Sequence, residues 1–389
     1  MVAMSRFRNL TQIEYPSLAR GILNFADAHA RHSLSKASRE LLGSSFDALM
    51  GNHSEDYFEA EDMFLDGISK HTGQTPQNIS TSITYSASIA LDIAAKYLAP
   101  RQSSVGMITP AFDSVAALFI RSGLNLIPVP EQRLTPECDF DYLDSLGLTA
   151  LVLITPNNPT GARLSRKGIR NLIEWSARNE VVLILDLSFR MFDTQSQGNL
   201  IAIGEELGAQ LITVDDTGKT IPLFDTKLGV LSMTSRLAPE IRNIYSDILL
   251  NVSELDLRLL SAVLLADDGN EVVAARDLAI SNHYLLTRDP RLERALHRGR
   301  PTEAPDFQPS VAWLDIGDHR DLVLDGCHAR SMQMLPGNGF FWDRPDSVSA
   351  GPGARWIRLP LLRDPEYFAR GAKILSSVLS EIVAMKETD

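Results

Sequence analysis

Two lysines in one short segment could act together on a single ligand. Lys219 and Lys227 lie eight residues apart in DDTGKTIPLFDTKLG, directly after the apolar run QLITV. A lysine amine can condense with an aldehyde as a Schiff base, and a second cation on the same loop can bind a phosphate. Pyridoxal phosphate (PLP) carries both groups, so this spacing predicts a PLP site. Taken alone, a lysine after a strand is more often a solvated surface residue.

Polar residues that follow two apolar runs support the same prediction. Asp186 ends VVLILD, where a carboxylate is costly unless it meets a cation such as the protonated pyridine nitrogen of PLP. Asn158 lies in the turn NNPTG after TALVLIT and could donate to the phenolic oxygen of PLP. The alternatives are a helix cap or loop carboxylate for Asp186 and a simple turn for NNPTG.

A ring and a group of small residues could complete such a site. Phe112 follows the run SVGMIT and could stack on the pyridine, although core packing is the alternative. Ser86, Ala87 and Ser88 open an expected helix, and small residues with hydroxyls at a helix N-terminus form a phosphate cradle. Helix capping alone would also select serine there.

The elements that must position these residues alternate along the chain. Apolar runs rich in β-branched residues predict buried strands at 104–109, 124–130, 149–155, 181–186 and 210–214. Amphipathic patterns predict helices at 88–98, 113–123 and 166–180. The alternation favours an α/β fold, a mostly parallel sheet flanked by helices, with ligands at the carboxyl ends of the strands. Further on, we expect helices at 254–266 and 271–296, strands at 311–317 and 355–360, and a helix from Pro365.

The length of 389 residues favours more than one domain. We expect an N-terminal arm over the active site (1–40), a large PLP-binding domain (41–270) and a smaller α+β C-terminal domain (271–389). No apolar run approaches the roughly 18 residues that span a bilayer, and the N-terminus lacks the apolar core of a secretion signal.

Charge and cysteine content narrow the class of protein. Cys138 and Cys327 are too few for a disulfide framework and lack metal-ligand spacing, so we expect a reduced, cytoplasmic protein with no metal site. The net charge of −12, without a run of either sign, argues against nucleic acid as a partner. It suits a cationic small molecule, but most soluble cytoplasmic enzymes share it.

In their order along the chain, these residues resemble the fold-type I PLP enzymes, the aspartate aminotransferase group. The resemblance spans roughly residues 80 to 360 and includes PGNGFFW and RWIRLPLL. It implies that fold, a homodimer, and a bidentate contact from Arg358 to the α-carboxylate of a substrate. In isolation, Arg358 would more often be a surface residue.

Three positions depart from that group. Phe189 stands where a tyrosine is usual, so the phenolic oxygen of PLP loses one donor. Lys227 replaces an arginine and keeps the charge without the planar fork. Asp216 replaces a serine three residues before Lys219, and a carboxylate there is unfavourable unless it faces a positive group. A cationic substrate side chain would supply that group.

Longer motifs resemble a narrower family. NLTQIEY, ADAHARHSLS, TPNNPTG, LDLSFRMFD, DDTGK and IYSDILLNVS are similar to the oxygen- and PLP-dependent L-arginine oxidases and hydroxylases of the enduracididine-pathway type. This resemblance implies that Lys219 is the Schiff base lysine and that Ser188 lies beside Asp186 at the pyridine. It also implies that Thr11, Glu14 and Asp216 surround the arginine side chain.

The N-terminal segment would supply the remaining groups. NLTQIEYPSL predicts a helix up to Pro16 with Thr11 and Glu14 on one face, although a solvated helix with a surface glutamate is the alternative. The resemblance implies a catalytic histidine near the substrate at His29, and His32, one helical turn away, could share or take over that role.

The resemblance implies oxidation of L-arginine by dioxygen through quinonoid intermediates, with release of hydrogen peroxide. The product would be a 2-keto acid, a 4-hydroxy-2-keto acid or a 4,5-unsaturated compound. An aminotransferase for a basic amino acid is the alternative and would require a keto acid acceptor. A non-catalytic PLP-fold sensor is the third possibility, but it would not need Lys219 together with Asp186.

Overall fold

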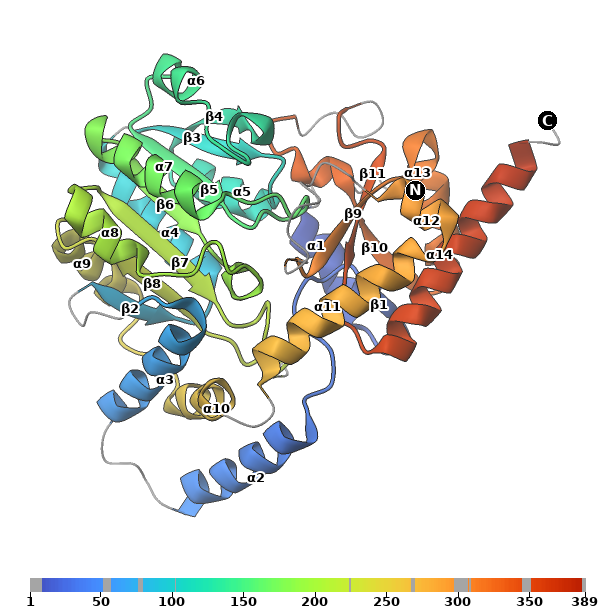
Figure 1. Ribbon diagram of the computed structural model, residues 1–389, viewed down its shortest axis with the longest axis horizontal. Helices are drawn as coiled ribbons and strands as arrows, with labels where there is room; N and C mark the ends of the chain where they lie inside the picture. The colour runs from blue at the N-terminus through green and yellow to red at the C-terminus, as the bar shows by residue number, and fades with distance from the viewer. Residues whose placement is uncertain are drawn as a thin grey trace.

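Two sheets organise the chain in the computed structural model (Figure 1). The structure describes residues 9–51, 57–75, 80–101, 103–223, 225–266, 270–296, 307, 309–344 and 351–386. Within these residues, no helix combines the length and the apolar character that crossing a membrane requires.

The larger sheet is mostly parallel, as predicted. Its described strands follow the order β2-β8-β7-β6-β5-β3-β4, and pairing is parallel from β7 to β4, whereas β8 runs antiparallel to both neighbours. The strands are β2 (Thr81–Thr84), β3 (Ser104–Thr109), β4 (Asn125–Pro130), β5 (Ala150–Ile154), β6 (Val182–Asp186), β7 (Leu211–Asp216) and β8 (Gly229–Met233).

Helices cover both faces of this sheet, with α7 and α8 on one face and α4 on the other (Figure 1). Every residue of β5, β6, β7 and β8 is buried, which explains why the central strands are continuous apolar runs. The helices of this region are α3 (Tyr57–Thr72), α4 (Ala87–Leu98), α5 (Asp113–Arg121), α6 (Phe140–Ser145), α7 (Arg166–Arg178), α8 (Leu200–Leu207), α9 (Ala238–Ile248) and α10 (Glu254–Leu265).

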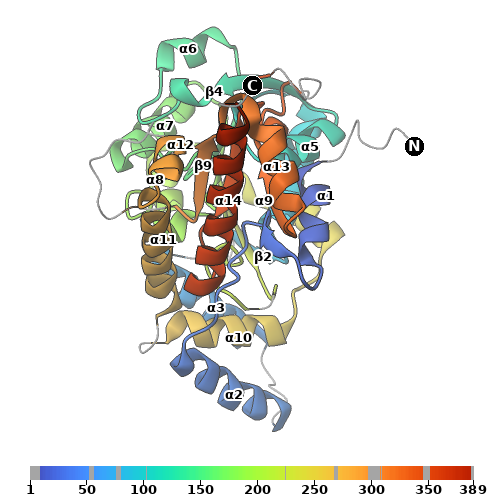
Figure 2. The ribbon, with the colours of Figure 1, turned by 90° about the vertical axis from the view of Figure 1, so that its right-hand side faces the viewer.

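The smaller sheet has the strand order β1-β10-β11-β9. β1 (Leu23–Phe25) pairs in parallel with β10 (Met332–Pro336), and β11 (Trp356–Pro360) pairs antiparallel with β10 and with β9 (Val311–Asp315). Figure 2 shows α14 in front of this sheet, with α11 and α13 on either side. The helices here are α11 (Glu271–Thr287), α12 (Pro290–Ala295), α13 (Arg320–His328) and α14 (Pro365–Lys386).

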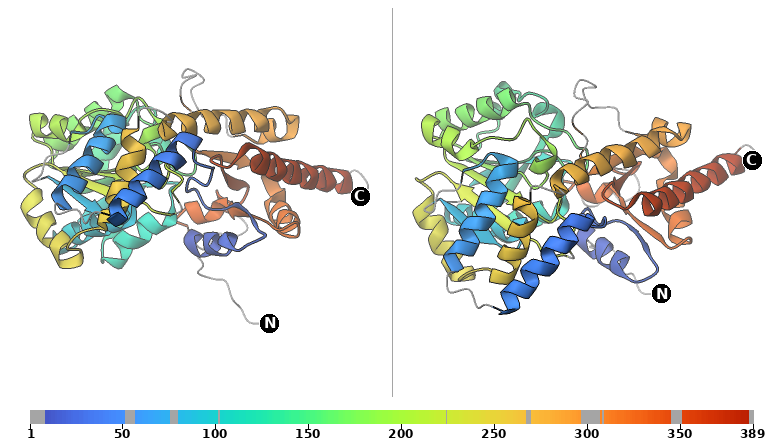
Figure 3. Two further views of the ribbon diagram at one scale, coloured as in Figure 1. Left: turned by 90° about the horizontal axis from the view of Figure 1, so that it is seen from below. Right: turned by 60° about the horizontal axis from the view of Figure 1, so that its bottom comes forward.

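The N-terminal segment contacts both regions. α1 (Leu10–Glu14) and a 3-10 turn (Tyr15–Leu18) precede β1, and α2 (Lys36–Gly51) then packs beside α10 of the larger region (Figure 3). Residues 23–25 thus belong to the small sheet, although they fall in the predicted arm; the boundaries at 40 and 270 stay predictions. The other 3-10 turns are Ala99–Arg101, Glu131–Arg133, Arg190–Phe192, Gly317–His319 and Gly337–Phe340.

The stretch 271–296 is divided into α11 and α12. The division falls at Asp289 because its side chain accepts from Arg291 N as an N-cap, while Pro290 cannot extend a preceding helix. Four described strands, β1, β2, β8 and β10, were not predicted. They are short, and β2 (TSIT) and β10 (MQMLP) lack a clear apolar pattern.

Candidate active site

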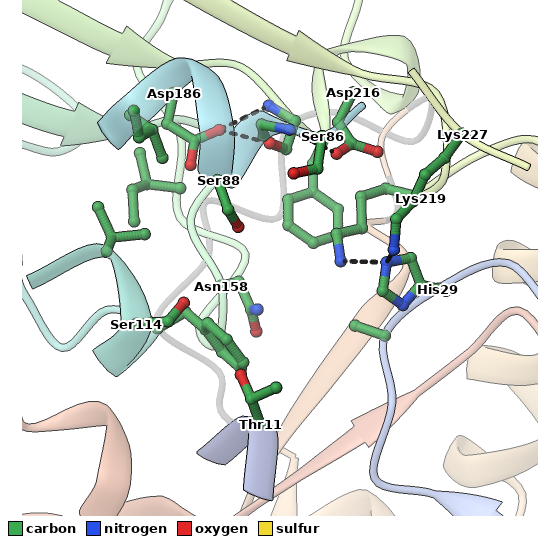
Figure 4. Close-up of a pocket in the computed structure, with 18 of the residues that line it drawn as sticks. Thr11, His29, Ser86, Ser88, Ser114, Asn158, Asp186, Asp216, Lys219 and Lys227 are labelled. Carbon is green, nitrogen blue, oxygen red and sulfur yellow. Dashed lines mark hydrogen bonds between the residues drawn. The ribbon is translucent and has the colours of Figure 1, made fainter. Parts of the chain in front are cut away.

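A cavity of about 300 Å³ lies where the carboxyl ends of the large-sheet strands face the N-terminal segment (Figure 4). All residues predicted for the site except Arg358 line it. They are Thr11, Glu14, His29, Ser86, Ala87, Ser88, Phe112, Asn158, Asp186, Ser188, Asp216, Lys219 and Lys227. Phe189 lines it too.

Asp186 provides a buried carboxylate at the end of β6. It is 5% exposed, and its Oδ1 accepts from the backbone N of Ser188 at 3.0 Å and from the Ser188 hydroxyl at 2.6 Å. Burial raises the pKa of Asp186 to about 6, although the bonds from Ser188 act in the opposite direction. A cationic ring nitrogen would compensate this buried charge.

Asn158 presents its side chain to the cavity from a turn that a buried acid supports. Glu131 accepts from Asn157 Nδ2 at 2.6 Å and from Thr160 Oγ1 at 2.5 Å, which fixes the turn on both sides of Asn158. Oδ1 of Asn158 is buried and has no hydrogen-bond partner among the described residues. The donor that the predicted bond to PLP needs is Nδ2 of the same side chain, which lines the cavity.

The N-terminus of α4 reaches the cavity through close packing against β8. Ser86 is the N-cap and its side chain accepts from Ile89 N. A Cβ atom on Gly229 would lie 2.7 Å from the carbonyl carbon of Ser86 and 2.8 Å from the nitrogen of Ala87. Only glycine therefore lets β8 lie against this helix N-terminus, where backbone N–H groups can bind a phosphate.

Asp216 lies at the same helix N-terminus. Its Oδ2 accepts from the backbone N of Ala87 at 3.1 Å, and its Oδ1 accepts from the backbone N of Gly218 at 2.7 Å. The carboxylate is thus held by two backbone donors while it lines the cavity. A contact with a substrate guanidinium stays a prediction.

His29 lies between the two lysines and a buried aspartate. Its Nε2 is 3.3 Å from Nζ of Lys219 and 3.0 Å from Nζ of Lys227, and its Nδ1 is 2.5 Å from Oδ1 of Asp27 (Figure 4 shows the lysine side). Burial and the charge of Lys219 lower the pKa of His29. His32 does not line the cavity, and its ring nitrogens have no partner in the described part of the chain.

Asp27 is a residue of this site that was not predicted from the sequence. The only signal was the pair D-A-H within ADAHARH, which places a carboxylate two residues before His29. Asp27 is 4% exposed, and Arg31 donates from Nε to its Oδ2 at 2.6 Å.

The arm helix α1 closes the cavity from the small-sheet side. Leu10 is fully buried in a cluster with Trp313 and Phe340, and its backbone N donates to Oδ2 of Asp113 at 2.9 Å. Thr11 and Glu14 then face the cavity together, as their spacing predicts. Burial raises the pKa of Glu14.

Arg358 lies on β11 and is the one predicted site residue that does not line the cavity. It is fully buried, and its Nη2 donates to Oε1 of Glu14 at 3.0 Å and to the carbonyl of Ala26. Nε and Nη1 are buried without a partner among the residues described. Two groups predicted for opposite ends of a substrate are therefore paired with each other, and the carboxylate-binding role of Arg358 stays a prediction.

These residues fit PLP. The cavity combines a lysine amine, a buried carboxylate, an asparagine side chain and the N-terminus of α4, where Asp216 accepts from Ala87 N. Phe112 adds a ring at its wall and meets Phe340 edge to face at 6.0 Å. Fold and site together are those of a PLP-dependent enzyme of the aminotransferase type.

Comparison with known proteins gives the family. The sequence profile of the aminotransferase class I and II family matches residues 18–289, and the chain belongs to this family. The alanine aminotransferase of Mycobacterium tuberculosis is 24% identical over an alignment of 235 residues that covers 55% of this chain and 51% of that protein. The chain thus spans about half the length of the curated relatives it matches.

Solved structures match over nearly the whole chain. MppP, soaked with its product 2-ketoarginine, superposes with a TM-score of 0.80 at 26% identity, over 91% of this chain and 99% of that one. LysN, the α-aminoadipate aminotransferase of Thermus thermophilus complexed with N-(5'-phosphopyridoxyl)-L-leucine, gives a TM-score of 0.76 at 17% identity, over 96% and 95%. The predicted fold-type I fold is confirmed.

Proposed function

We propose that this chain oxidises L-arginine with dioxygen, using PLP, and releases hydrogen peroxide. The observation that supports arginine as the substrate is the acidic wall of the cavity, where Glu14 and Asp216 line the same space as Lys219. A cationic side chain compensates such carboxylates, whereas a neutral or acidic one does not. The similarity to MppP, whose soaked product is 2-ketoarginine, supports arginine as that cation.

The residues that would hold PLP come from the large sheet. Lys219 would carry it covalently, Asp186 would pair with the ring nitrogen, and Lys227 with the N-terminus of α4 would bind the phosphate. When bound, PLP supplies an electron-accepting ring that stabilises negative charge at the substrate Cα. Asn158 would orient that ring through a bond donated by its Nδ2, and Phe112 would cover one face.

The reaction also needs groups that move protons. Lys219 Nζ is placed to take the proton from the substrate Cα once its amine is released. His29 lies within 3.3 Å of that amine and, with its lowered pKa, is a neutral acceptor near pH 7. The proton at the substrate Cγ, whose removal precedes hydroxylation or desaturation, would need an acceptor of the same kind.

The apolar side chain of Phe189 supports dioxygen as the electron acceptor. Phe189 lies where aminotransferases usually carry a tyrosine, is 4% exposed and packs with Ala28 and Val311. Simple oxidation converts arginine, dioxygen and water into 2-ketoarginine, ammonia and hydrogen peroxide. Hydroxylation at C4 consumes a second dioxygen and a second water and releases a second peroxide.

An aminotransferase that acts on a basic amino acid is the second candidate. Membership in the aminotransferase class I and II family supports it directly. The same acidic wall would select the same substrate, so the two candidates differ in the electron acceptor alone. A homodimer, which the family resemblance implies, is a further part of the proposal under either candidate.

The proposal is tested by measuring dissolved oxygen in a sealed cell that holds the purified protein, PLP and L-arginine. We expect oxygen consumption with accumulation of peroxide and no requirement for a keto acid; Lys219→Ala is the control. Mass spectra of the products then separate oxidation from hydroxylation. Absence of oxygen uptake, with turnover once pyruvate is added, would replace the proposal with the aminotransferase.

A further inference from the structure

Asp27 has no part in the proposed reaction, yet it lies directly behind the histidine of the cavity. Its Oδ1 is 2.5 Å from Nδ1 of His29 and also accepts the backbone N–H of His29 at 2.9 Å. On the far side of the ring, Nε2 faces Nζ of Lys227 at 3.0 Å and Nζ of Lys219 at 3.3 Å. The imidazole thus connects a buried carboxylate with both lysines.

The geometry assigns the ring proton. Ammonium groups only donate hydrogen bonds, so Nε2 must be the acceptor, and Nδ1 must carry the proton that Asp27 accepts. We propose that Asp27 is a positioning residue that holds the ring through its Nδ1–H, so that Nε2 of His29 can accept a proton from Lys219. The proposal rests on Lys219 being the cofactor lysine of the proposed function.

Asp27 is itself held from two sides. Arg31 donates from Nε to Oδ2 at 2.6 Å and also pairs with Asp225 at 3.0 Å. Arg363 donates to the backbone oxygen of Asp27 at 2.5 Å and to that of His29 at 3.0 Å. Burial acts to raise the pKa of Asp27, but the bond to His29 and the nearby positive charges outweigh it and hold the pKa below its ordinary value.

The proposed step moves one proton and no electrons. Lys219 must lose a proton before its amine can bond to an aldehyde. The N–H bond at Nζ breaks, an N–H bond forms at Nε2 of His29, and the positive charge passes from the ammonium to the imidazolium. Asp27 stabilises that imidazolium, as an orienting carboxylate does in serine hydrolases.

The groups around the ring keep Nε2 of His29 unprotonated at rest. Burial and the charge of Lys219, with a smaller contribution from Lys227, lower the pKa of His29 against the effect of Asp27. The carboxylate of Glu14, on α1, interacts electrostatically with Lys219 from the opposite wall. His29 therefore holds the proton only transiently and releases it to solvent water, because a charged ring beside Lys227 is disfavoured.

The test compares Asp27→Asn with Asp225→Asn. Both replace a carboxylate that pairs with Arg31 by an amide, but Asp225 is half exposed and has no contact with His29. The first readout is the ¹⁵N spectrum of the imidazoles in histidine-labelled protein without PLP, with His29 assigned through His29→Gln. The second is the rate at which added PLP forms its lysine-bound absorbance band, followed against pH.

We expect the Nδ1–H tautomer at His29 in all three proteins, because the lysines face Nε2 in each, and an Nδ1 resonance shifted by the weaker hydrogen bond only in Asp27→Asn. We also expect PLP incorporation near pH 7 to slow about 10²-fold in Asp27→Asn, the lower end of what a positioned proton acceptor contributes. The rate should recover at high pH, where no acceptor is needed. An unchanged Nδ1 resonance or an unchanged rate in Asp27→Asn would overturn the proposal.

His29→Gln keeps the test decisive if Asp27→Asn does not fold, because it removes the acceptor and leaves Asp27 in place. It should slow incorporation near pH 7 about 10²-fold, and an unchanged rate would overturn the proposal. Where Asp27→Asn folds, the double variant should lose no more than either single one, whereas additive losses would mean that Asp27 acts by another route. Neither readout uses arginine or dioxygen. A failure of the oxygen experiment therefore leaves this result intact, and the two proposals can fail separately.

Discussion

The two walls of the cavity are built in different ways. The cofactor wall consists of residues at the ends of β6 and β7 and in the loop after β7, such as Asp186 and Lys219, and the strands beneath them are buried throughout. The substrate wall depends on α1, a five-residue helix that Leu10 and the Glu14–Arg358 pair attach to the small sheet.

The difference separates two tasks. A wall fixed by parallel strand pairing holds its groups at constant distances, which suits a cofactor that stays bound. A short helix held by one buried leucine, one ion pair and one backbone bond to Asp113 can be displaced and repositioned with little loss of core packing. Substitutions on the first wall should therefore affect every reaction of the enzyme, and those on the second should affect the choice of substrate.

The largest effect is expected from Lys219→Ala on the cofactor wall. Activity should fall by ~10³-fold or more, because covalent catalysis supplies a large share of the rate enhancement. The absorbance band of lysine-bound PLP should vanish with it. Lys36→Ala, at an exposed position on α2, is the control and should keep the band. Survival of the band in Lys219→Ala would overturn the cofactor assignment.

Asp216→Asn tests where the two walls meet. The affinity for arginine should fall by about 1.5–3 kcal/mol, the value of a hydrogen bond to a charged group, with a much smaller effect on PLP affinity. Asp186→Asn should show the reverse order. Isothermal titration of both ligands measures the two ratios. Equal losses of arginine and PLP in Asp216→Asn would contradict the proposed contact with the guanidinium.

Gly229→Ala should damage the cofactor wall without removing any charged group. The new Cβ atom would lie 2.7 Å from the backbone of Ser86, so β8 or α4 must move, at a cost of about 1–3 kcal/mol in the free energy of unfolding. PLP affinity should decrease in parallel. Gly43→Ala is the matched control, because nothing lies within 4 Å of its added methyl group. Equal melting temperatures of the two variants would disprove the close approach.

The smallest effect is expected from Asp113→Asn, where the arm touches the large region. Burial raises the pKa of Asp113 to about 6, so its ionisation destabilises the folded protein as the pH rises through that value. The variant should therefore gain up to about 1–2 kcal/mol over the unsubstituted protein.

Denaturant unfolding at several pH values measures this gain. It should grow between about pH 4, near the ordinary pKa of an aspartate, and pH 6, and then stay constant. The amide oxygen introduced by Asp113→Asn could still accept from Leu10 N, so the arm should stay in place. A gain that is the same at every pH would rule out titration of Asp113 as its cause.

The cofactor wall was largely predictable from the sequence, whereas the substrate wall was not. Asp186 and Asn158 each follow an apolar run, and parallel strands bring their carboxyl ends to one edge, so local patterns place both residues in one cavity. β8 was not predicted because its five residues, GVLSM, show no distinctive hydrophobic period.

Long-range pairing is what the sequence could not provide. Glu14 and Arg358 bond across 344 residues, and no local pattern indicates that these two predicted substrate groups meet each other. Glu131 fixes the NNPTG turn from 26 residues away. It was not predicted because an acid directly after a strand has no distinctive sequence signal. Asp27 was overlooked because a two-residue spacing from a histidine is common in any loop.

The Arg363 side chain has a mechanical consequence. It follows β11 and binds the backbone oxygens of Asn24, Asp27 and His29, so the histidine segment is clamped to the small sheet, while Lys219 belongs to the loop after β7. A bond from Ala30 N to Gly218 O at 3.0 Å ties the same segment to that loop. A rotation of one sheet against the other would therefore strain the Ala30–Gly218 bond. The distance from Nε2 of His29 to the two lysine nitrogens would then report how far the two sheets have rotated.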